Sequence, residues 1–244
     1  MTDTADAIVI GAGVIGAATA FELAKLGYRT LSVDRNAEAG HGSTSGSCAI
    51  IRVHYSTLDG TAFAYEGFFY WRDWADYLGV VDERGLATFR DVGCLVMKTE
   101  ANDHMANYIA HCDELGIPYE DWAPAKIVGR LPIYDMQAYY PAKRRDDPGF
   151  AEPTGDAIAG GVFFPTAGYV TDPALASHNL QRAAEAHGAR FRFNAPIVEI
   201  LRRDGRATGV KLADGEELLA PVVINVGGPA SSQINEMAGV TGDM

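Results

Sequence analysis

Three glycines near the start of the chain have the spacing of a pyrophosphate-binding turn. Gly11, Gly13 and Gly16 form a G-x-G-x-x-G pattern directly after the apolar run 7–10. In such a pattern the first glycine permits a tight turn, the second leaves room for phosphates, and the third lets a helix pack closely on a strand. The N-terminus of that helix then faces the anion. The pattern therefore predicts a dinucleotide-binding site.

The residues around these glycines predict the elements that position them. Residues 7–10 read as a buried strand, and Ala17, Phe21 and Ala24 recur at helical spacing before Gly27 ends the helix. A second strand is predicted over residues 29–33. It ends at Asp34, the expected acceptor for a ribose hydroxyl. A lone glycine pattern is often an ordinary turn, but the strand, helix, strand and acidic residue in register favour the dinucleotide interpretation.

Composition excludes several classes of protein. The chain has 244 residues, 48% of them hydrophobic and 21% charged, which is typical of a globular protein with room for two subdomains. The net charge of -12, with no basic cluster longer than residues 143–145, argues against a nucleic-acid surface. No segment is apolar enough to span a bilayer. Residues 1–6 are polar and acidic, unlike a secretory signal, so we expect a cytoplasmic protein.

The cysteines predict neither a disulfide framework nor a metal site. Cys48, Cys94 and Cys112 are odd in number, widely spaced and free of any C-x-x-C pair.

The dinucleotide pattern is interrupted and then resumes. An aromatic stripe over 63–78 predicts a core helix. A Pro-rich stretch over 129–154 is interpreted as a surface loop. The intervening segment holds predicted strands and helices at 93–98, 100–115, 124–130 and 161–164. Asp172 and Pro173 then open a helix that ends at Gly188. Predicted strands follow at 190–193, 197–202, 207–212, 217–219 and 222–226.

This order predicts an α/β protein with a discontinuous dinucleotide-binding domain. Residues 1–84 and 170–244 form a Rossmann-like domain, interrupted over residues 85–169 by part of an α+β substrate domain.

Three blocks of the sequence resemble the D-amino-acid oxidase and sarcosine oxidase family of FAD-dependent amine oxidoreductases. The first is the glycine pattern through Asp34, and the third runs from Gly161 to Gly227. The second, STSGSCAIIRVHY over 43–55, is the more specific, because many flavoproteins share the other two. It is similar to the flavin-facing loop of sarcosine oxidases. The resemblance implies that the cofactor is FAD, and we expect it to be bound without a covalent bond. It also implies an FAD-binding domain like that of glutathione reductase.

The resemblance also assigns candidate site residues. It implies that Arg52 meets a substrate carboxylate, with Tyr55 in the same region, while His54 is interpreted as a satisfied packing histidine. His41 and Cys48 lie near the flavin loop, but no spacing rule predicts attachment to the cofactor. Ser45 and Ala49 stand where monomeric sarcosine oxidase has a histidine and an arginine, which leaves the substrate open. The candidate FAD-binding residues are Gly11, Gly13, Val14, Ile15, Gly16, Asp34, Arg35, Gly42, Ser43, Thr44, Ser45, Ile197 and Gly227.

By this resemblance the expected reaction is FAD-dependent oxidation of the C–N bond of an amino acid or N-substituted glycine. The substrate would be a sarcosine-like secondary amine or a D-amino acid, and the product an imine that water hydrolyses. Two alternatives stay open. An NAD-dependent dehydrogenase is disfavoured by the Gly/Ser-rich loop at 40–47 and by the long insertion. A dinucleotide-binding fragment without turnover is the other. Family members continue beyond residue 244, so the resemblance implies either a fragment or a chain whose fold is completed by a second polypeptide, and we expect the second polypeptide.

Overall fold

The computed structural model describes residues 4–100, 102 and 105–240, and within them the chain forms two compact units. Unit 1 comprises Met1–Ala49, Asp73–Thr88 and Val170–Met244, and unit 2 comprises Ile50–Arg72 and Phe89–Tyr169. The domain limits expected from the sequence, after residues 84 and 169, stay a prediction.

Unit 1 is built on a parallel sheet. Its strands are β1 (Ala7–Ile10), β2 (Thr30–Val33), β9 (Arg190–Arg192) and β13 (Val222–Asn225), in the order β13-β1-β2-β9. All three pairings are parallel. The four residues of β1 and the four of β2 are all buried, as expected for strands covered on both faces. The predicted Rossmann-like α/β fold is therefore confirmed.

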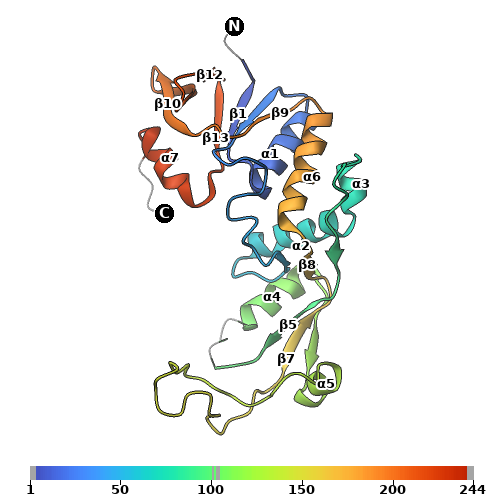
Figure 1. Ribbon diagram of the computed structural model, residues 1–244. Coiled ribbons are helices and arrows are strands. Elements are labelled where there is room, and N and C mark those ends of the chain that lie inside the picture. The colour runs from blue at the N-terminus through green and yellow to red at the C-terminus, as the bar shows by residue number, and fades with distance from the viewer. Residues whose placement is uncertain (1–3, 101, 103–104, 241–244) are drawn as a thin grey trace. The chain divides into compact units, whose positions relative to one another are not determined.

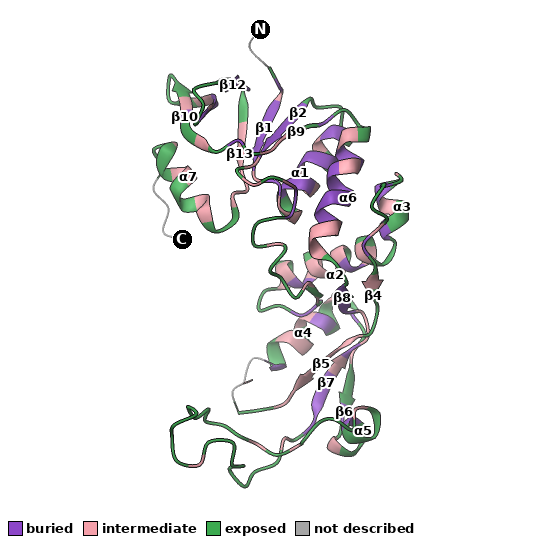
Figure 2. Cartoon of the chain, viewed as in Figure 1, coloured by how far each residue is buried: buried purple, intermediate pink, exposed green. Residues whose placement is uncertain are grey.

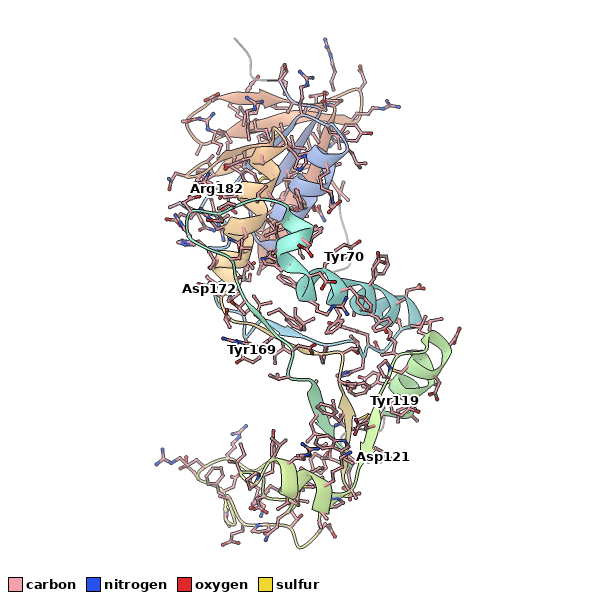
Figure 3. The ribbon with its side chains drawn as sticks, turned by 90° about the vertical axis from the view of Figure 1, so that its right-hand side faces the viewer. Tyr70, Tyr119, Asp121, Tyr169, Asp172 and Arg182 are labelled. Carbon is pink, nitrogen blue, oxygen red and sulfur yellow. The ribbon has the colours of Figure 1, made fainter. Side chains whose placement is uncertain are left out.

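Two helices of unit 1 lie side by side against this sheet (Figure 1). They are α1 (Val14–Lys25) and α6 (Pro173–Ala186). Most of the buried residues of α1 are small, which lets the two helices approach closely: Gly16, Ala17, Ala20, Phe21 and Ala24. The Asp172 carboxylate caps α6 by accepting a hydrogen bond from the Leu175 N–H at 2.8 Å. Figure 3 labels Asp172 at the start of α6 and Arg182 further along it.

A second, antiparallel sheet completes the core of unit 1. It consists of β10 (Ile197–Arg203), β11 (Arg206–Leu212) and β12 (Glu217–Leu219). The buried residues of β1 and β2 on one side of the parallel sheet pack against this second sheet. Figure 2 shows β1 and β2 in the purple of buried residues. The cluster includes Ile8, Ile10, Leu31, Val33, Ile200, Val210, Leu212 and Leu218. The remaining elements of unit 1 are α3 (Trp74–Leu78), the 3-10 turn η1 (Gly228–Ala230) and α7 (Ser231–Met237).

The described residues of unit 2 form two small sheets and three helices. The sheets have the orders β5-β7-β6 and β3-β8-β4. A core of aromatic and aliphatic residues holds it together: Val53, Phe68, Met105, Cys112, Ile117, Val162 and Phe164. The strands are β3 (Ile50–Ile51), β4 (Phe89–Arg90), β5 (Cys94–Met97), β6 (Glu120–Trp122), β7 (Gly161–Phe164) and β8 (Gly168–Val170). The helices are α2 (Leu58–Arg72), α4 (Met105–Leu115) and α5 (Pro124–Arg130).

The structure corrects the single helix predicted over 63–78. Asp73 leaves the helical region, with φ of -102° and ψ of 37°, so α2 ends at Arg72 and α3 begins at Trp74. Helical spacing of aromatic residues continues across the break, which is why the pattern alone missed it. Of the helix predicted over 100–115, α4 forms the part from Met105 to Leu115. Glu100 and Asn102 are not helical, and residues 101, 103 and 104 lie outside the described residues. Among the described helices, none combines the length and apolar character needed to cross a membrane.

Candidate functional site

The three glycines of the first turn have different steric reasons to be glycine. Gly11 has φ of +109°, and a Cβ there would lie 2.5 Å from the carbonyl oxygen of Val226. A Cβ on Gly16 would collide with the carbonyl oxygen of Gly11. A Cβ on Gly13 would meet only Thr44 Oγ1, at 3.1 Å, beyond its chain neighbours. The first and third glycines therefore serve packing, and the second leaves an open surface.

The Gly/Ser-rich loop returns to this turn and is bonded to it at two points. The Gly40 N–H donates to the carbonyl oxygen of Ala12 at 2.8 Å. Thr44 Oγ1 accepts from the N–H of Val14, the first residue of α1, at 3.1 Å. The residues between these two bonds are thereby held beside the N-terminus of α1.

Asp34 ends β2 and is fixed by the backbone. Its Oδ2 accepts from the Ala12 N–H at 2.7 Å, and its Oδ1 accepts from the Asn36 N–H at 2.8 Å. A carboxylate has about four acceptor sites, so capacity for a ribose hydroxyl remains on a group that is already oriented. Its role toward a ribose stays a prediction.

These elements surround a groove of about 540 Å³ that lies within unit 1. The predicted cofactor residues that line it are Gly11, Gly13, Val14, Ile15, Gly16, Asp34, Arg35, Gly42, Ser43, Thr44, Ile197 and Gly227. Ser45 is not one of its lining residues. Its N–H and Oγ instead bond the carbonyl oxygens of Gly40 and Gly42, each at 2.9 Å, and brace the loop. The open surface at Gly13 and the size of the groove fit a dinucleotide.

The sequence analysis did not assign several lining residues. Asn36 directly follows the predicted Arg35, and Val226 and Gly228 flank the predicted Gly227. All three lie at carboxyl ends of strands, where ligands of open α/β sheets bind, so their neighbours were the available signal. His41 was noted only as lying near the loop. No motif marked the lining residues of α7 and the β9–β10 connection: Ala195, Pro196, Gln233, Ile234 and Met237.

The other candidate residues, Arg52 and Tyr55, lie in unit 2. The guanidinium carbon of Arg52 lies 4.8 Å from the centre of the Tyr55 ring. Both side chains are exposed, and among the described residues Arg52 has no ion pair or hydrogen bond. The Tyr55 backbone is held by Thr61 Oγ1, at 3.3 Å from both its N–H and its carbonyl oxygen. The pair is thus a preformed cation–π contact with an uncompensated charge.

His54 packs in the core of unit 2, as expected, but it is not satisfied. Its side chain stacks on Phe164, with ring centres 4.5 Å apart, and its Nδ1 has no hydrogen-bond partner among the described residues. Burial, with a smaller contribution from the charge of Arg52, lowers the pKa of His54 from 6.5 to about 4. The imidazole is therefore neutral at pH 7, and it adds no second positive charge beside Arg52.

A polar cluster in unit 1 was missed by the sequence analysis. Asp82 Oδ2 lies 2.8 Å from His178 Nδ1 and accepts from Asn179 Nδ2 at 2.6 Å. Glu83 is bound by Arg182, which Figure 3 labels on α6. The three groups Asp82, Glu83 and His178 have the spacing of metal ligands, but each is engaged by a protein partner. The cluster therefore ties residues 82–85 to α6.

The three thiols are free. Cys48 is exposed, Cys94 is intermediate and Cys112 is buried. Burial raises the pKa of Cys112 to about 11, so this thiol is protonated at neutral pH.

A parallel sheet with a glycine turn, an acidic residue at the end of β2 and a groove at the strands' carboxyl ends defines a dinucleotide-binding protein. The sequence profile of the DAO family, described as FAD dependent oxidoreductase, matches residues 6–243, and the chain belongs to this family. Its cofactor is therefore FAD.

The chain is similar to parts of several longer proteins. The chain is 27% identical over 229 residues to the tRNA 5-methylaminomethyl-2-thiouridine biosynthesis bifunctional protein MnmC of Pseudomonas entomophila, covering 91% of this chain and 29% of that protein. L-proline dehydrogenase from P. horikoshii has a TM-score of 0.79 at 21% identity, with 98% of this chain and 57% of that chain covered. Glycine oxidase from Geobacillus kaustophilus has a TM-score of 0.74 at 21% identity, with 98% and 59% covered. The chain thus spans less than two thirds of each of these proteins, and the two structural matches show a shared fold.

Proposed function

We propose that the enzyme containing this chain oxidises the C–N bond of an amino acid or an N-substituted glycine. The product is an imine, which water hydrolyses. The names of two structural neighbours, L-proline dehydrogenase and glycine oxidase, support an amino-acid substrate. Sarcosine-like secondary amines and D-amino acids are the proposed candidates.

The observation that carries this proposal is the exposed Arg52, which is stacked on Tyr55 and has no ion pair among the described residues. A guanidinium holds a carboxylate through two parallel N–H···O bonds, which fixes the orientation of an amino acid as well as its charge. The Tyr55 ring limits the freedom of the guanidinium, so less entropy is lost when the carboxylate binds. Because His54 is neutral at pH 7, Arg52 is the positively charged side chain of the segment 52–55.

The proposed holder of FAD is the groove of unit 1. Backbone N–H groups at the start of α1 and the surface of Gly13 would receive the diphosphate, and Asp34 would receive a ribose hydroxyl. When bound, FAD supplies the two-electron acceptor for the oxidation. Residues 1–84 and 170–244 form the proposed FAD domain, and residues 85–169 form part of the proposed substrate domain.

An anaerobic substrate screen tests this function. The flavin absorbance of the purified enzyme is followed after adding glycine, sarcosine, proline or D-alanine, with N-methylethylamine as an analogue that lacks the carboxylate. We expect bleaching by at least one amino acid and none by the analogue. Equal bleaching by the analogue, or bleaching that persists unchanged in Arg52→Gln, would remove the carboxylate contact from the proposal. Arg144→Gln, which changes another exposed arginine of unit 2, is the control.

A second candidate is a subunit that needs a completing polypeptide for turnover. It is favoured by the open outer edges of β5 and β6 in a sheet of only three described strands. Size-exclusion chromatography with mass spectrometry on native material distinguishes the two. A second polypeptide that co-elutes with the chain and is required for flavin bleaching supports this candidate. An active, flavin-loaded 26.1 kDa monomer contradicts it.

A further inference from the structure

The first turn of α2 contains a completely buried hydroxyl group. Thr61 is 0% exposed, although the Arg52 and Tyr55 side chains that precede this helix are exposed. A hydroxyl buried in this way costs stability unless it is hydrogen bonded. Thr30 in unit 1 is 1% exposed, and its Oγ1 has no partner among the described residues. The hydroxyl of Thr61, in contrast, has three main-chain partners within hydrogen-bond distance.

Two of these three partners belong to Tyr55. Its N–H donates to Thr61 Oγ1 at 3.3 Å, and its carbonyl oxygen lies 3.3 Å from the same Oγ1. The third partner is the carbonyl oxygen of Thr57, at 3.0 Å. A hydroxyl has one proton to donate, so the two carbonyl oxygens share it. Thr61 thereby holds the main chain of Tyr55 on both sides of its Cα, which restricts the direction of the Cα–Cβ bond.

Two further contacts confine Tyr55. On α4, His111 Nδ1 lies 3.3 Å from its carbonyl oxygen. Gly60 lies against the base of its side chain, because a Cβ on Gly60 would be 3.4 Å from Tyr55 Cβ and 3.8 Å from Cγ. Tyr55 is 38% exposed, so neighbouring side chains do not enclose its ring. The main-chain contacts therefore set where the ring points.

The position of this ring matters for Arg52, whose guanidinium carbon lies 4.8 Å from the ring centre. We propose that Thr61 is a positioning residue for the substrate carboxylate, acting through Tyr55 on the guanidinium of Arg52. The inference rests on the Arg52 contact of the proposed function. A guanidinium stacked on a fixed ring loses less conformational freedom when it binds a carboxylate. Without the Thr61 hydroxyl, Tyr55 moves more freely, Arg52 moves with it, and the carboxylate is held more weakly.

Thr61→Val in the FAD-loaded enzyme tests this inference, because it replaces the hydroxyl by a methyl group. KM and kcat are measured with whichever of glycine, sarcosine, proline and D-alanine bleaches the flavin. We expect KM to rise about fivefold, the scale of one lost hydrogen bond. The kcat should stay unchanged, because the carboxylate contact is the same in the ground and transition states. Thr61→Ser keeps the hydroxyl and should retain the KM of the unaltered enzyme. Thr30→Val, which removes the unpaired buried hydroxyl of unit 1, is the matched control and should leave KM unchanged.

A double variant separates positioning from a general loss of stability. In an Arg52→Gln background the carboxylate contact is already removed, so adding Thr61→Val should raise KM no further. A purely structural role predicts the same fold-change in both backgrounds. If thermal unfolding shows that Thr61→Val does not fold, His111→Leu replaces it, because it removes the other side-chain contact to the Tyr55 carbonyl oxygen. It should raise KM in the unaltered background and not beside Arg52→Gln.

The outcomes that overturn the inference are distinguishable from failure of the proposed function. An unchanged KM in folded Thr61→Val, beside a raised KM in Arg52→Gln, removes the role of Thr61 and leaves Arg52 as the carboxylate contact. Equal fold-changes in the two backgrounds, or a KM that stays raised in Thr61→Ser, would make Thr61 a structural residue only. An unchanged KM in Arg52→Gln itself, or no bleaching by any of these amino acids, overturns the proposed function together with the inference.

Discussion

The groove of unit 1 and the proposed Arg52 site of unit 2 differ in whether main chain or side chains form them. The groove is shaped by the main chain: glycines remove side chains, backbone N–H groups begin α1, and Asp34 is held by two backbone bonds. The unit 2 site consists of side chains, with Arg52 stacked on Tyr55 and no ionic partner among the described residues. A binding site formed by the main chain keeps its shape through most substitutions that retain its glycines. A binding site formed by side chains can change its ligand preference through a single substitution.

Both units bury polar groups, and one of those in unit 1 makes an extensive set of hydrogen bonds. In unit 1 the buried Asn179 makes four hydrogen bonds, to Asp82, Gly85, Ala87 and Trp74. In unit 2 the buried His54 leaves Nδ1 unpaired. In unit 1 the buried hydroxyls of Thr30 and Ser32 also have no partner among the described residues. Buried polar groups therefore stabilise unit 1 where they are paired, and they cost stability in both units where they are not.

The largest expected effect comes from filling the main-chain groove. Gly13→Val places branched methyl groups over the open surface where the phosphates are predicted to bind, so FAD binding should be abolished. Flavin absorbance per protein after purification measures it. Gly67→Ala in α2 is the control, because its Cβ would have no neighbour within 4 Å. A Gly13→Val variant with a full flavin complement would refute the assignment of the groove.

The second largest effect is expected from removing the positive charge of Arg52 in unit 2. Arg52→Ala removes a charge-assisted carboxylate contact, which costs on the order of 2 to 5 kcal/mol when it is desolvated. The change should appear in kcat/KM for amino-acid substrates, with flavin content unchanged. Arg144→Ala should leave both quantities unchanged. An unaltered kcat/KM in Arg52→Ala would show that the unit 2 pair does not bind substrate.

The four hydrogen bonds of the buried Asn179 predict a change in stability. Asn179→Leu leaves the Ala87 N–H and part of Asp82 without partners, so the free energy of unfolding should fall by about 3 kcal/mol. Gln181→Leu on the same helix removes the hydrogen bond to Glu185 and should cost less than half as much. Thermal unfolding of both variants measures this. Equal losses would argue against Asn179 as the organising residue of this cluster.

A smaller effect is expected from the pH dependence of His54. Its pKa is lowered in the folded state from 6.5 to about 4, so the folded state resists protonation. The stability associated with neutral His54 is fully present above pH 6.5 and is lost as the pH falls toward 4, by at most about 1.4 kcal/mol per pH unit. His54→Phe should flatten the fall in melting temperature between these pH values. An identical pH profile in the variant would contradict the buried neutral imidazole.

The two regions also differ in how far sequence reasoning could reach. The unit 1 sheet, α1 and α6 follow from local signals: apolar runs, helical spacing and the Asp172-Pro173 start. The strands β3, β4, β6 and β8 have two or three residues each and form through pairing between distant segments, so no local period marks them. The break at Asp73 and the unpaired Nδ1 of His54 depend on tertiary packing in the same way. The glycine pattern and Asp34 predicted part of the groove lining from local sequence, but Ser45 does not line it, and the residues that α7 and the β9–β10 connection contribute required the structure.

The central claim is that unit 1 holds FAD through its main-chain groove, and calorimetric titration of the flavin-free protein with ADP and with riboflavin tests it most directly. ADP carries the adenine, ribose and diphosphate that the groove is proposed to bind, so it should bind, compete with FAD and lose its binding in Gly13→Val. Riboflavin, which lacks these groups, should bind far more weakly. Tight binding of riboflavin with no binding of ADP would contradict the claim.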